Sequence, residues 1–508
     1  MPETDQEDVL AFLQGGALGR DVTRIDTHAA ILLLAGELAF KLKRPVRYSF
    51  LDFTTLADRE AVLRHELDLN RRYAPDLYRR VLPVTREPAG LALDGPGTPV
   101  EWLLEMRRFP AAAQLDRVAA AGELADGLVD ALGETVARSH AAAPPRLDKG
   151  GAAAMREIAA GNRIDLTVAA PAVFSADAVR ELGAATAAAL DRLGPMLDAR
   201  RAAGRVRHCH GDLHLANIVL LDGRPVLFDC IEFDDDFACI DVLYDLAFLV
   251  MDLIEKGHQS AAIRLLNGWL ERTGDHAGLA LLPLFLSLRA AIRAKVLGLA
   301  ALRDPNADRG EPRRYLGLAA RFLTPAPPVL VAVGGGSGTG KTTLARALAP
   351  ELPGPAPGAV ILRSDVIRKE LFARPASERL PVEAYLPEVS ERVFATIAER
   401  AASCLAGGHS VIADAVYGHA AQRAGIAAVA AARRVPFHGF WLEAPLRLKL
   451  DRVARRMGDA SDADAAVVRR QAETIDAASV TWRRLAADRP LTELAAEVLA
   501  IVPRPART

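Results

Sequence analysis

The chain has 508 residues, of which 51% are hydrophobic and 25% are charged, and its 63 basic and 64 acidic side chains leave a net charge of -1. This length exceeds the size at which one hydrophobic core stops growing, so we expect two or three domains. The near-neutral balance excludes a chain-wide field that would attract nucleic acid or an anionic membrane. The 4 cysteines are irregularly spaced, which excludes a disulfide framework and paired zinc clips and favours a reducing cytoplasm.

The N-terminus lacks the features of a targeting segment. Its opening stretch is acidic (MPETDQEDVLAFLQGG) and has neither the basic start nor the apolar run of a signal peptide. No window of about 18 residues is apolar and free of charge, as a membrane-spanning helix requires. We therefore expect a soluble, cytoplasmic protein that does not bind membranes, and the sequence does not define its oligomeric state.

The part of the chain before Phe322 changes character near Phe109. Before that point, strand-like runs (AAILLLAGELAFKLK and VEWLLEMRRF) lie on either side of a stretch with helical spacing (LADREAVLRHELDLNRRYA). After it come long Ala/Leu-rich helical patterns, one of which begins at the capping residues Ser175 and Asp177. We expect a strand-rich small lobe over residues 1–108 and a helical large lobe over residues 109–322.

Within the large lobe, one segment (HCHGDLHLANIVLLDGRPVLFDCIEF, His208–Phe233) fits two kinds of chemistry, metal binding and phosphoryl transfer. Zinc requires ligands that converge at about 2.0 to 2.3 Å. On a strand His208 and His210 would share one face while Cys209 points the other way, and no second pair of ligands follows. We therefore prefer phosphoryl transfer over a metal site made by this cluster.

The same segment resembles a known enzyme family. Its HGDLHLAN run, with Asp229 at the end of the apolar run RPVLFD, resembles the catalytic loop and magnesium aspartate of the aminoglycoside phosphotransferase branch of the protein-kinase-like fold. The resemblance implies that Asp212 receives or orients the proton of the acceptor hydroxyl, while Asn217 and Asp229 bind Mg²⁺ on the phosphates of ATP. It also implies that His210 is structural and ties the loop to the lobe.

This resemblance further implies a lysine for the inner phosphates and a carboxylate that holds it. The run ELAFKLKRP supplies Lys41 and Lys43 on one side of a strand, and we prefer Lys41. We prefer Glu66 as its partner, with Glu60 as the rival on the same helical stretch. The run LLEMRRF is expected to form the hinge against adenine. The lobe departs from the kinase pattern, because Gly36 in LLLAGELAF replaces a G-x-G-x-x-G loop.

A proline-rich stretch divides the chain a second time. We expect a linker over residues 323–328, because its prolines cannot continue a helix and a β-branched run begins at once afterwards. Four apolar strand-like runs then alternate with helical segments: PVLVAVGG, GAVILRSD, HSVIADAV and PFHGFWLEA. This alternation predicts an α/β domain over residues 329–508, with a parallel sheet and its ligand at the carboxyl ends of the strands.

The first of these strands leads into a phosphate-binding motif. The run GGSGTGKT satisfies G-x-x-x-x-G-K-[ST] between Gly335 and Thr342, and a helix is expected directly behind it. Glycines such as Gly335 and Gly340 let backbone amides converge on phosphate oxygens. Lys341 can reach the outer phosphates, and the Thr342 hydroxyl can join the Mg²⁺ shell. The motif therefore predicts ATP and Mg²⁺ as cofactors of this domain too.

Two later strands each end in an aspartate. Asp365 follows the second strand, where a carboxylate can orient or deprotonate an attacking hydroxyl, and Arg368 one turn later can hold an anionic acceptor. Asp414 ends the third strand and can bind Mg²⁺ through water. The alternative for each residue is a helix cap or a solvated charged surface.

An arginine cluster follows in what we expect to be a lid, RVARRMGDASDADAAVVRRQ. An arginine supplied to the transferring phosphoryl group can contribute a factor of about a thousand or more, and Arg452 and Arg456 are the preferred candidates. The order and spacing of these features resemble the P-loop kinase group that contains gluconate kinase, the kinase half of polynucleotide kinase and the zeta toxins. The whole chain therefore resembles a fusion of two kinase domains.

We accordingly predict an ATP-dependent phosphotransferase, bifunctional if both domains act, that transfers the γ-phosphate to a hydroxyl of a small metabolite. One alternative is a nucleotide-responsive regulatory or stress protein with weak transfer, which the glycine-poor small lobe motivates. The other is phosphorylation of polynucleotide 5′-hydroxyls by the C-terminal domain. Acidic residues dilute the basic groove that this last activity requires, so nucleic acid is not the expected partner.

Overall fold

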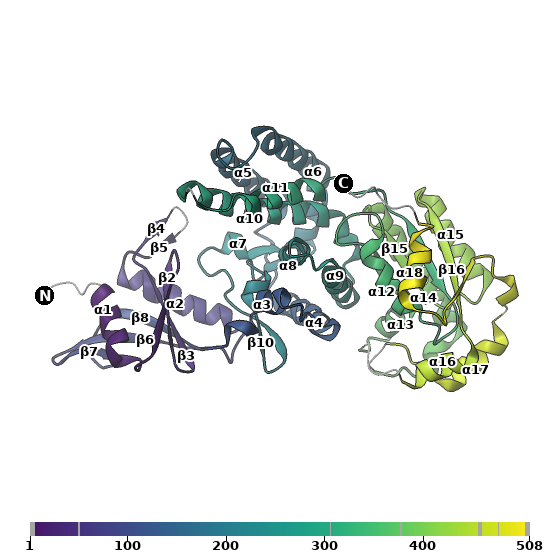
Figure 1. Ribbon diagram of the computed structural model, residues 1–508, viewed down its shortest axis with the longest axis horizontal. Coiled ribbons are helices and arrows are strands. Elements are labelled where there is room, and N and C mark those ends of the chain that lie inside the picture. Colours follow the sequence, from purple (N-terminus) through teal and green to yellow (C-terminus); the bar gives the residue numbers. More distant parts are fainter. Residues whose placement is uncertain are drawn as a thin grey trace. The chain divides into compact units, whose positions relative to one another are not determined.

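The computed structural model describes residues 6–48, 51–304, 306–375, 378–455, 460–475 and 477–502 (Figure 1). By packing, the chain falls into two compact units. The first contains residues 1–154 and 198–249, and the second contains residues 155–197 and 250–508. These units reflect packing and do not test the sequence-defined limits at residues 322 and 329, which stay a prediction.

The first unit starts with a six-stranded antiparallel sheet in the order β1-β2-β3-β8-β6-β7, as the small-lobe prediction requires. Its strands are β1 (Val22–Asp26), β2 (Ala30–Ala35), β3 (Leu38–Lys43), β6 (Tyr78–Glu87), β7 (Gly90–Leu93) and β8 (Thr98–Arg107). A separate short hairpin consists of β4 (Arg47–Tyr48) and β5 (Leu51–Asp52). The turn between β2 and β3 has only two residues, and Gly36 occupies it with a φ of 56°, a conformation that glycine adopts without strain.

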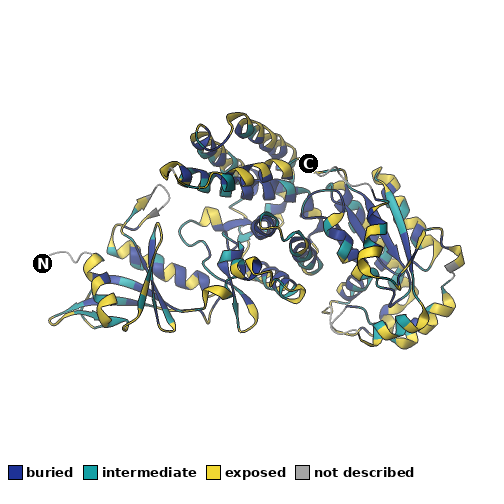
Figure 2. Cartoon of the chain, viewed as in Figure 1, coloured by how far each residue is buried: buried dark blue, intermediate teal, exposed yellow. Residues whose placement is uncertain are grey.

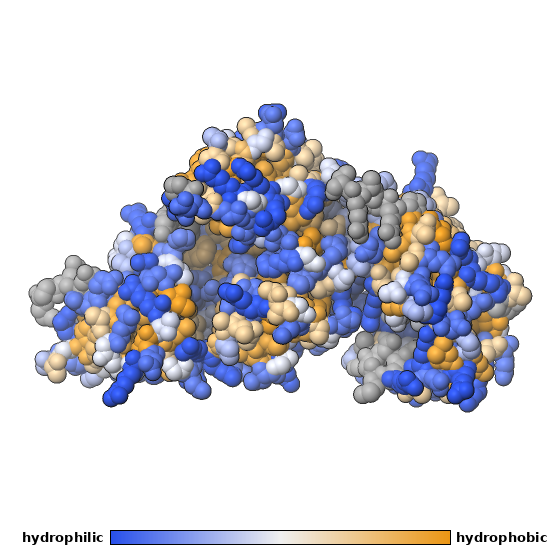
Figure 3. All heavy atoms as spheres, viewed as in Figure 1, coloured by the Kyte–Doolittle hydropathy of each residue, from blue (hydrophilic) through white to orange (hydrophobic). Residues whose placement is uncertain are grey.

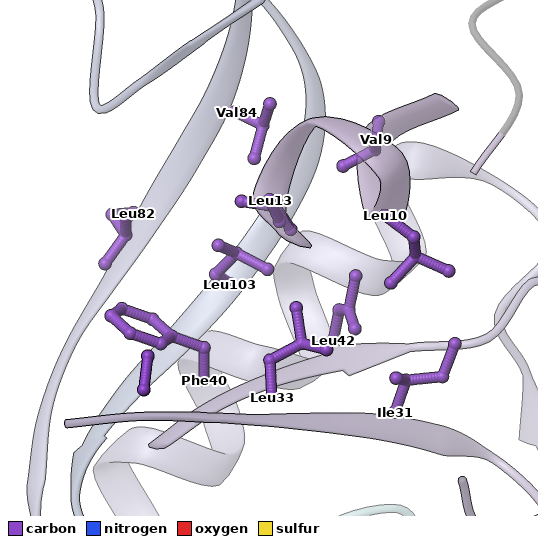
Figure 4. Packing of buried hydrophobic residues seen from close by; sticks show 11 residues of the cluster. Val9, Leu10, Leu13, Ile31, Leu33, Phe40, Leu42, Leu82, Val84 and Leu103 are labelled. Atoms are coloured by element: carbon purple, nitrogen blue, oxygen red, sulfur yellow. The ribbon is translucent and has the colours of Figure 1, made fainter. Parts of the chain in front are cut away.

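A helix packs on each face of this sheet. Helix α1 (Gln6–Phe12) and the π-helical turn η1 (Leu13–Ala17) cover one face, where Leu10 and Leu13 lie among buried residues such as Leu33 and Leu42 (Figure 4). Helix α2 (Leu56–Asn70) covers the other face, with its apolar residues in a cluster that includes Leu104 of β8. The second cluster, which joins Leu63 and Leu67 of α2 to Ala39 of β3, fixes the position of α2 against β3, and each of these two elements carries a predicted site residue.

The rest of the first unit holds the segment that resembles a catalytic loop. Its elements are η2 (Ala111–Ala113), α3 (Leu115–Ala120), α4 (Asp126–Ala142), β9 (Val206–His208), η3 (Leu215–Asn217), β10 (Ile218–Leu221), β11 (Arg224–Leu227), α7 (Asp235–Ala238), β12 (Cys239–Asp241) and α8 (Val242–Glu255), which runs into the second unit. Strand β9 pairs with β12, and β10 pairs with β11. The loop between β9 and β10 is therefore held at both ends by short antiparallel pairs.

Most helices of the predicted large lobe lie in the second unit. They are α5 (Gly151–Ala169) and α6 (Ala176–Ala202), which both extend into the first unit, α9 (Gln259–Thr273), η4 (His276–Leu281), α10 (Leu282–Arg303) and α11 (Gly310–Phe322). The stretch His276–Arg303 is long and apolar enough to cross a membrane, but 72% of its most apolar window is buried inside the protein. This burial is what a core helix of a helical lobe shows.

The second unit also contains the predicted parallel sheet, whose strand order is β14-β15-β13-β16-β17. Four of its strands lie where the sequence predicts them, namely β13 (Leu330–Gly334), β14 (Val360–Arg363), β15 (Val411–Asp414) and β16 (Phe437–Glu443), and β17 (Arg483–Ala486) adds an edge. Its helices are α12 (Lys341–Leu348), η5 (Ala349–Glu351), α13 (Ser364–Leu371), η6 (Val382–Tyr385), α14 (Pro387–Ala406), α15 (Ala420–Arg433), α16 (Leu446–Ala454), α17 (Ala465–Thr474), η7 (Ala477–Ser479) and α18 (Leu491–Leu499). The central strands are buried along their length, as Figure 2 shows by colour. The fold prediction is thus confirmed for both parts of the chain.

Helix α9 covers the edge strand β14 of this sheet. The Asn267 side chain accepts a hydrogen bond from the Ile361 backbone N–H at 2.9 Å and donates one to the Ala359 carbonyl at 3.3 Å. These bonds satisfy backbone groups that an edge strand leaves unpaired. Hydrophilic side chains are spread over the face of the molecule shown in Figure 3, as expected for a chain with 25% charged residues.

Candidate active sites

Strand β3 and helix α2 bring both candidate lysines onto one carboxylate in the first unit. The Lys41 ammonium lies 2.6 Å from Glu66 and 2.9 Å from Asp229. The Lys43 ammonium lies 2.7 Å from the other Glu66 oxygen and 2.7 Å from Glu232. Glu66 is 0% exposed, so its charge depends on these two ion pairs. Of the two lysines, Lys41 is the one that contacts Asp229, the predicted metal ligand, whereas Lys43 contacts Glu232.

The surroundings of Glu66 set its ionisation. Burial opposes its charge, but the ion pairs to Lys41 and Lys43 outweigh burial and lower the pKa of Glu66 to about 2. Burial also opposes the charge of Lys41, and the nearby Asp229 and Glu66 carboxylates raise its pKa well above the usual value. The rival carboxylate, Glu60, instead pairs with Arg64 at 2.8 Å near the surface.

We expect Glu66→Gln to lower the free energy of unfolding by about 3 kcal/mol, because it removes a buried charge and leaves two lysines without it. Glu60→Gln is the matched control on the same helix, and loss of its surface pair should change stability by less than about 0.5 kcal/mol. Denaturant unfolding of both variants measures the difference. Equal stabilities would show that the buried network does not hold α2 against β3.

The same network predicts a pH dependence. The folded pKa of Glu66, about 2, lies below the ordinary value of 4.5, so its ionisation stabilises the folded state above pH 4.5. This contribution is lost as the pH falls from 4.5 toward about 2. Acid unfolding of the wild type should therefore be steeper in this range than that of Glu66→Gln.

The loop between β9 and β10 places Asp212 on the surface of the site. The side chain of Asp212 is 41% exposed, and Asn217 donates hydrogen bonds to its carboxylate and its carbonyl, both at 3.0 Å. The His214 ring lies 3.3 Å from the same carboxylate. Both of these bonds use the Asn217 amide nitrogen, so they do not occupy its amide oxygen. The loop thus presents one carboxylate that a neighbouring amide holds in place.

Buried groups hold this loop from behind. The His210 ring bonds to the Phe228 carbonyl at 2.9 Å, directly before Asp229, and the Asp245 carboxylate accepts the Gly211 backbone N–H at 2.9 Å. Burial lowers the pKa of His210, which favours a neutral ring. His140 bonds to Asp245 at 3.0 Å. His210 therefore connects the loop to the segment that carries the predicted metal aspartate.

Asp229 itself has a left-handed backbone, with a φ of 58°. A non-glycine residue in this region is held there by its surroundings and is enriched at functional sites. The Tyr78 hydroxyl accepts the Asp229 backbone N–H at 3.0 Å, and the Asn70 side chain accepts the next N–H, that of Cys230, at 3.0 Å. Sequence reasoning missed Tyr78 and Asn70, because no motif marks a residue that bonds only to backbone.

Among the described residues of this unit, two groups of side chains could hold a metal ion, and neither consists of the run of histidines and cysteine that the sequence raised. They are His140 with Cys209 and Asp245, and His208 with Asp235 and Cys239. In the first, His140 and Asp245 bond to each other. In the second, Arg146 donates to Asp235 at 3.0 Å and to the Cys239 sulfur at 3.2 Å, and burial raises the pKa of Cys239 to about 11. Protein partners therefore engage residues of both groups.

In the second unit, the phosphate-binding motif connects β13 to α12. Gly335 and Gly340 have φ angles of 135° and 94°, which only glycine adopts without strain. The Lys341 ammonium donates to the Gly336 carbonyl at 3.2 Å, and the Thr342 hydroxyl donates to the Asp414 carboxylate at 2.5 Å. The loop, its lysine and its hydroxyl thus lie together at the carboxyl ends of the strands.

Asp414 sits at the end of β15 and is 4% exposed. Burial raises its pKa above the usual value, while the charges of Lys341 and Arg363 act in the opposite direction. Because a hydroxyl and a carboxylate meet here, the donor atoms are oxygens of the type that Mg²⁺ prefers. The residues present therefore fit the predicted metal.

Helix α13 carries both acceptor-side candidates. Asp365 lies in its first turn and is half-buried, and its charge acts on Asp414 and on Arg368. The Arg368 guanidinium is buried, donates to the Ala384 carbonyl at 2.5 Å and lies 5.0 Å from the centre of the Tyr385 ring. In this structure Arg368 therefore holds the segment around Tyr385, and its contact with an acceptor stays a prediction.

Of the two candidate arginines of the lid, Arg452 lies within the described residues. Arg452 on α16 donates to the carbonyls of Thr339 at 3.2 Å and Ala487 at 2.9 Å, so it holds the phosphate loop through the backbone. Arg456 lies outside the described residues. A contact of either arginine with a transferring phosphoryl group stays a prediction.

Two lid residues that sequence reasoning missed, Gln471 and Asp462, contact other parts of this site. The Gln471 side-chain oxygen on α17 accepts the backbone N–H of Ser337 in the phosphate loop at 2.7 Å. The Asp462 carboxylate accepts hydrogen bonds from Lys369 of α13 at 2.7 Å and from the Tyr385 hydroxyl at 2.7 Å. The lid is thus joined to the phosphate loop and to the acceptor-side helix.

Comparison with known proteins finds a separate family match for each of the two parts of the chain that carry these sites. Residues 56–282 match the family model of the phosphotransferase enzyme family, and residues 330–478 match the AAA domain model. The uncharacterized protein Rv2004c of Mycobacterium tuberculosis is 32% identical over 451 residues, which cover 87% of this chain and 88% of that protein.

Two solved structures are similar to parts of the chain. A choline/ethanolamine kinase family protein from Mesorhizobium loti is 17% identical, with a TM-score of 0.39, and the match covers 63% of this chain and 95% of that chain. A sugar kinase from Janibacter is 22% identical, with a TM-score of 0.26, and the match covers 34% of this chain and 94% of that chain.

Proposed function

This chain belongs to the family of the mycobacterial protein Rv2004c and is an ATP-dependent kinase, and we propose that it is bifunctional. Each of its two sites would transfer the γ-phosphate of ATP to a hydroxyl of a small metabolite. The observation that carries the proposal is that each site has its own lysine near its own carboxylate. Lys41 contacts Asp229, and Lys341 follows a glycine-rich loop whose Thr342 contacts Asp414.

In the first site, Asp212 is the proposed base. Its carboxylate is exposed enough to meet an acceptor hydroxyl, and Asn217 fixes its orientation. Lys41 would bind the inner phosphates, and the oxygens of Asn217 and Asp229 would hold Mg²⁺. Bound Mg²⁺ would neutralise the charge that develops on the phosphates.

In the second site, the amides of the glycine-rich loop and Lys341 would bind the phosphates, and Thr342 with Asp414 would hold Mg²⁺. Asp365, in the first turn of α13, would orient or deprotonate the acceptor. The net charge of -1 offers no general attraction for nucleic acid, which supports a small acceptor over a polynucleotide 5′-hydroxyl.

The test is untargeted mass spectrometry of a bacterial metabolite extract incubated with MgATP and the full chain. We expect products that gain one phosphate with the wild type. Some should disappear with Asp212→Ala and others with Lys341→Ala. Products that survive both single replacements would refute the assignment of the two sites. If one of the two replacements leaves every product in place, the chain is not bifunctional.

A nucleotide-responsive regulator is the second candidate, and the occupied amide of Ser337 favours it, because ATP must displace Gln471 from the phosphate loop. On this reading ATP binds and changes the packing of the lid, and transfer stays near background. Small-angle scattering with and without ATP distinguishes the two. A large change in shape without any phosphorylated product would favour the regulator.

A further inference from the structure

The Gln471 side chain of the lid accepts a hydrogen bond from a backbone amide of the phosphate-binding loop, a type of group that binds phosphate in such loops. The Gln471 side-chain oxygen accepts the Ser337 N–H at 2.7 Å, and Ser337 lies within the Gly335–Thr342 motif. Backbone amides of such loops converge on phosphate oxygens. A bound phosphate oxygen and the Gln471 oxygen would therefore compete for the same hydrogen.

The position of Lys341 indicates which phosphate this is. Its ammonium, which in such motifs reaches the outer phosphates, contacts the carbonyl of Gly336, the residue next to Ser337. The Gln471 oxygen lies 3.6 Å from where a side chain at Gly336 would begin. Gln471 and Lys341 therefore contact the neighbouring residues Ser337 and Gly336 of the loop. This is where we expect the terminal phosphate of a bound nucleotide to lie.

The lid is also fixed on the acceptor side. Asp462, between α16 and α17, accepts bonds from Lys369 of α13, from Tyr385 and from the Leu380 backbone N–H at 2.9 Å. Asp365, the proposed acceptor-side carboxylate, lies on the same helix α13. The lid thus contacts the phosphate loop through Gln471 and the helix that carries Asp365 through Asp462.

We propose that Gln471 is a positioning residue that recognises the terminal phosphate of ATP. Without nucleotide its oxygen accepts from Ser337, and with ATP a terminal phosphate oxygen takes that N–H while the Gln471 amide nitrogen donates to the same phosphate. ADP lacks this phosphate, so the site should prefer ATP over ADP through Gln471. This inference rests on the proposed function of the P-loop site.

The test measures the affinity of the full chain for ADP and for a non-hydrolysable ATP analogue by calorimetry. All proteins carry Lys41→Ala to weaken the first site, and the signal lost with Lys341→Ala defines binding at the P-loop. Gln471→Ala should reduce the preference for the ATP analogue over ADP about tenfold, because it removes one hydrogen bond to a charged phosphate. ADP affinity should not fall.

Two further variants sharpen the result. Gln471→Glu keeps the size of the side chain but places a negative charge against the phosphate, so the ATP analogue should lose more affinity than with Gln471→Ala. Glu473→Ala, at an exposed position of the same helix, is the matched control and should leave the preference unchanged.

The outcomes are distinguishable. If binding depends on Lys341 but the preference is the same with Gln471→Ala as with wild type, the inference about Gln471 is wrong and the proposed function stands. Nucleotide binding that does not depend on Lys341 at all would overturn both.

Discussion

Asp212→Asn is expected to lower the turnover number of the Lys41-dependent transfer by about a thousandfold, the usual contribution of a positioned base. The replacement keeps the shape of the side chain and still offers an oxygen to Asn217, so the loop should keep its fold. KM for ATP should change little, because Asp212 acts on the acceptor. The measurement is the steady-state rate of formation of the product that disappears with Lys41→Ala.

The matched control for this variant is Asp222→Asn. Asp222 is 82% exposed in the turn between β10 and β11, and its φ of 50° is a conformation that asparagine tolerates well. It should keep the wild-type rate. A thousandfold loss with both variants would point to misfolding, and a wild-type rate with Asp212→Asn would remove Asp212 from the reaction.

Lys341→Ala is expected to reduce the second activity at least about a hundredfold, the scale seen when one group that stabilises the transition state is removed. Lys341 is the cation of the phosphate loop, and its loss should also weaken binding of ATP at that site. The Asp212-dependent product should form at the wild-type rate. Product analysis of one reaction mixture reports both activities together.

Lys295→Ala is the control for Lys341→Ala. Lys295 lies in the same unit and pairs with Asp165 at 3.3 Å in a partly exposed position, where such a pair contributes little stability. It should retain both activities. If Lys341→Ala behaves like Lys295→Ala, the glycine-rich loop does not bind the phosphates of a transferred group.

Much of the fold could be predicted because its patterns are local. The four apolar runs of the parallel sheet coincide with β13 to β16, since buried parallel strands have continuous apolar sequences. The edge strand β17 escaped prediction, because only Leu485 of its four residues is buried and arginines dominate it. An edge strand lacks the pattern by which buried strands are found.

The residues of the candidate sites could be predicted only where they belong to a recognisable sequence motif. Lys41 and Lys43 share one face of β3 by the two-residue period of a strand, so sequence alone could not tell which of them reaches Asp229. Gln471 and Asp462 belong to no motif, and their contacts depend on how the lid packs. The arginine cluster of the lid marked Arg452 as a candidate for contact with the phosphoryl group, yet in the structure its guanidinium donates to backbone carbonyls.

The number of ATP molecules bound per chain tests the central claim most directly. Calorimetry with a non-hydrolysable ATP analogue and Mg²⁺ should give two sites for the wild type. Lys41→Ala and Lys341→Ala should each weaken a different one, and the double variant should bind neither tightly. A single site in the wild type, or the same site lost with both replacements, would contradict two independent phosphoryl-transfer sites in this chain.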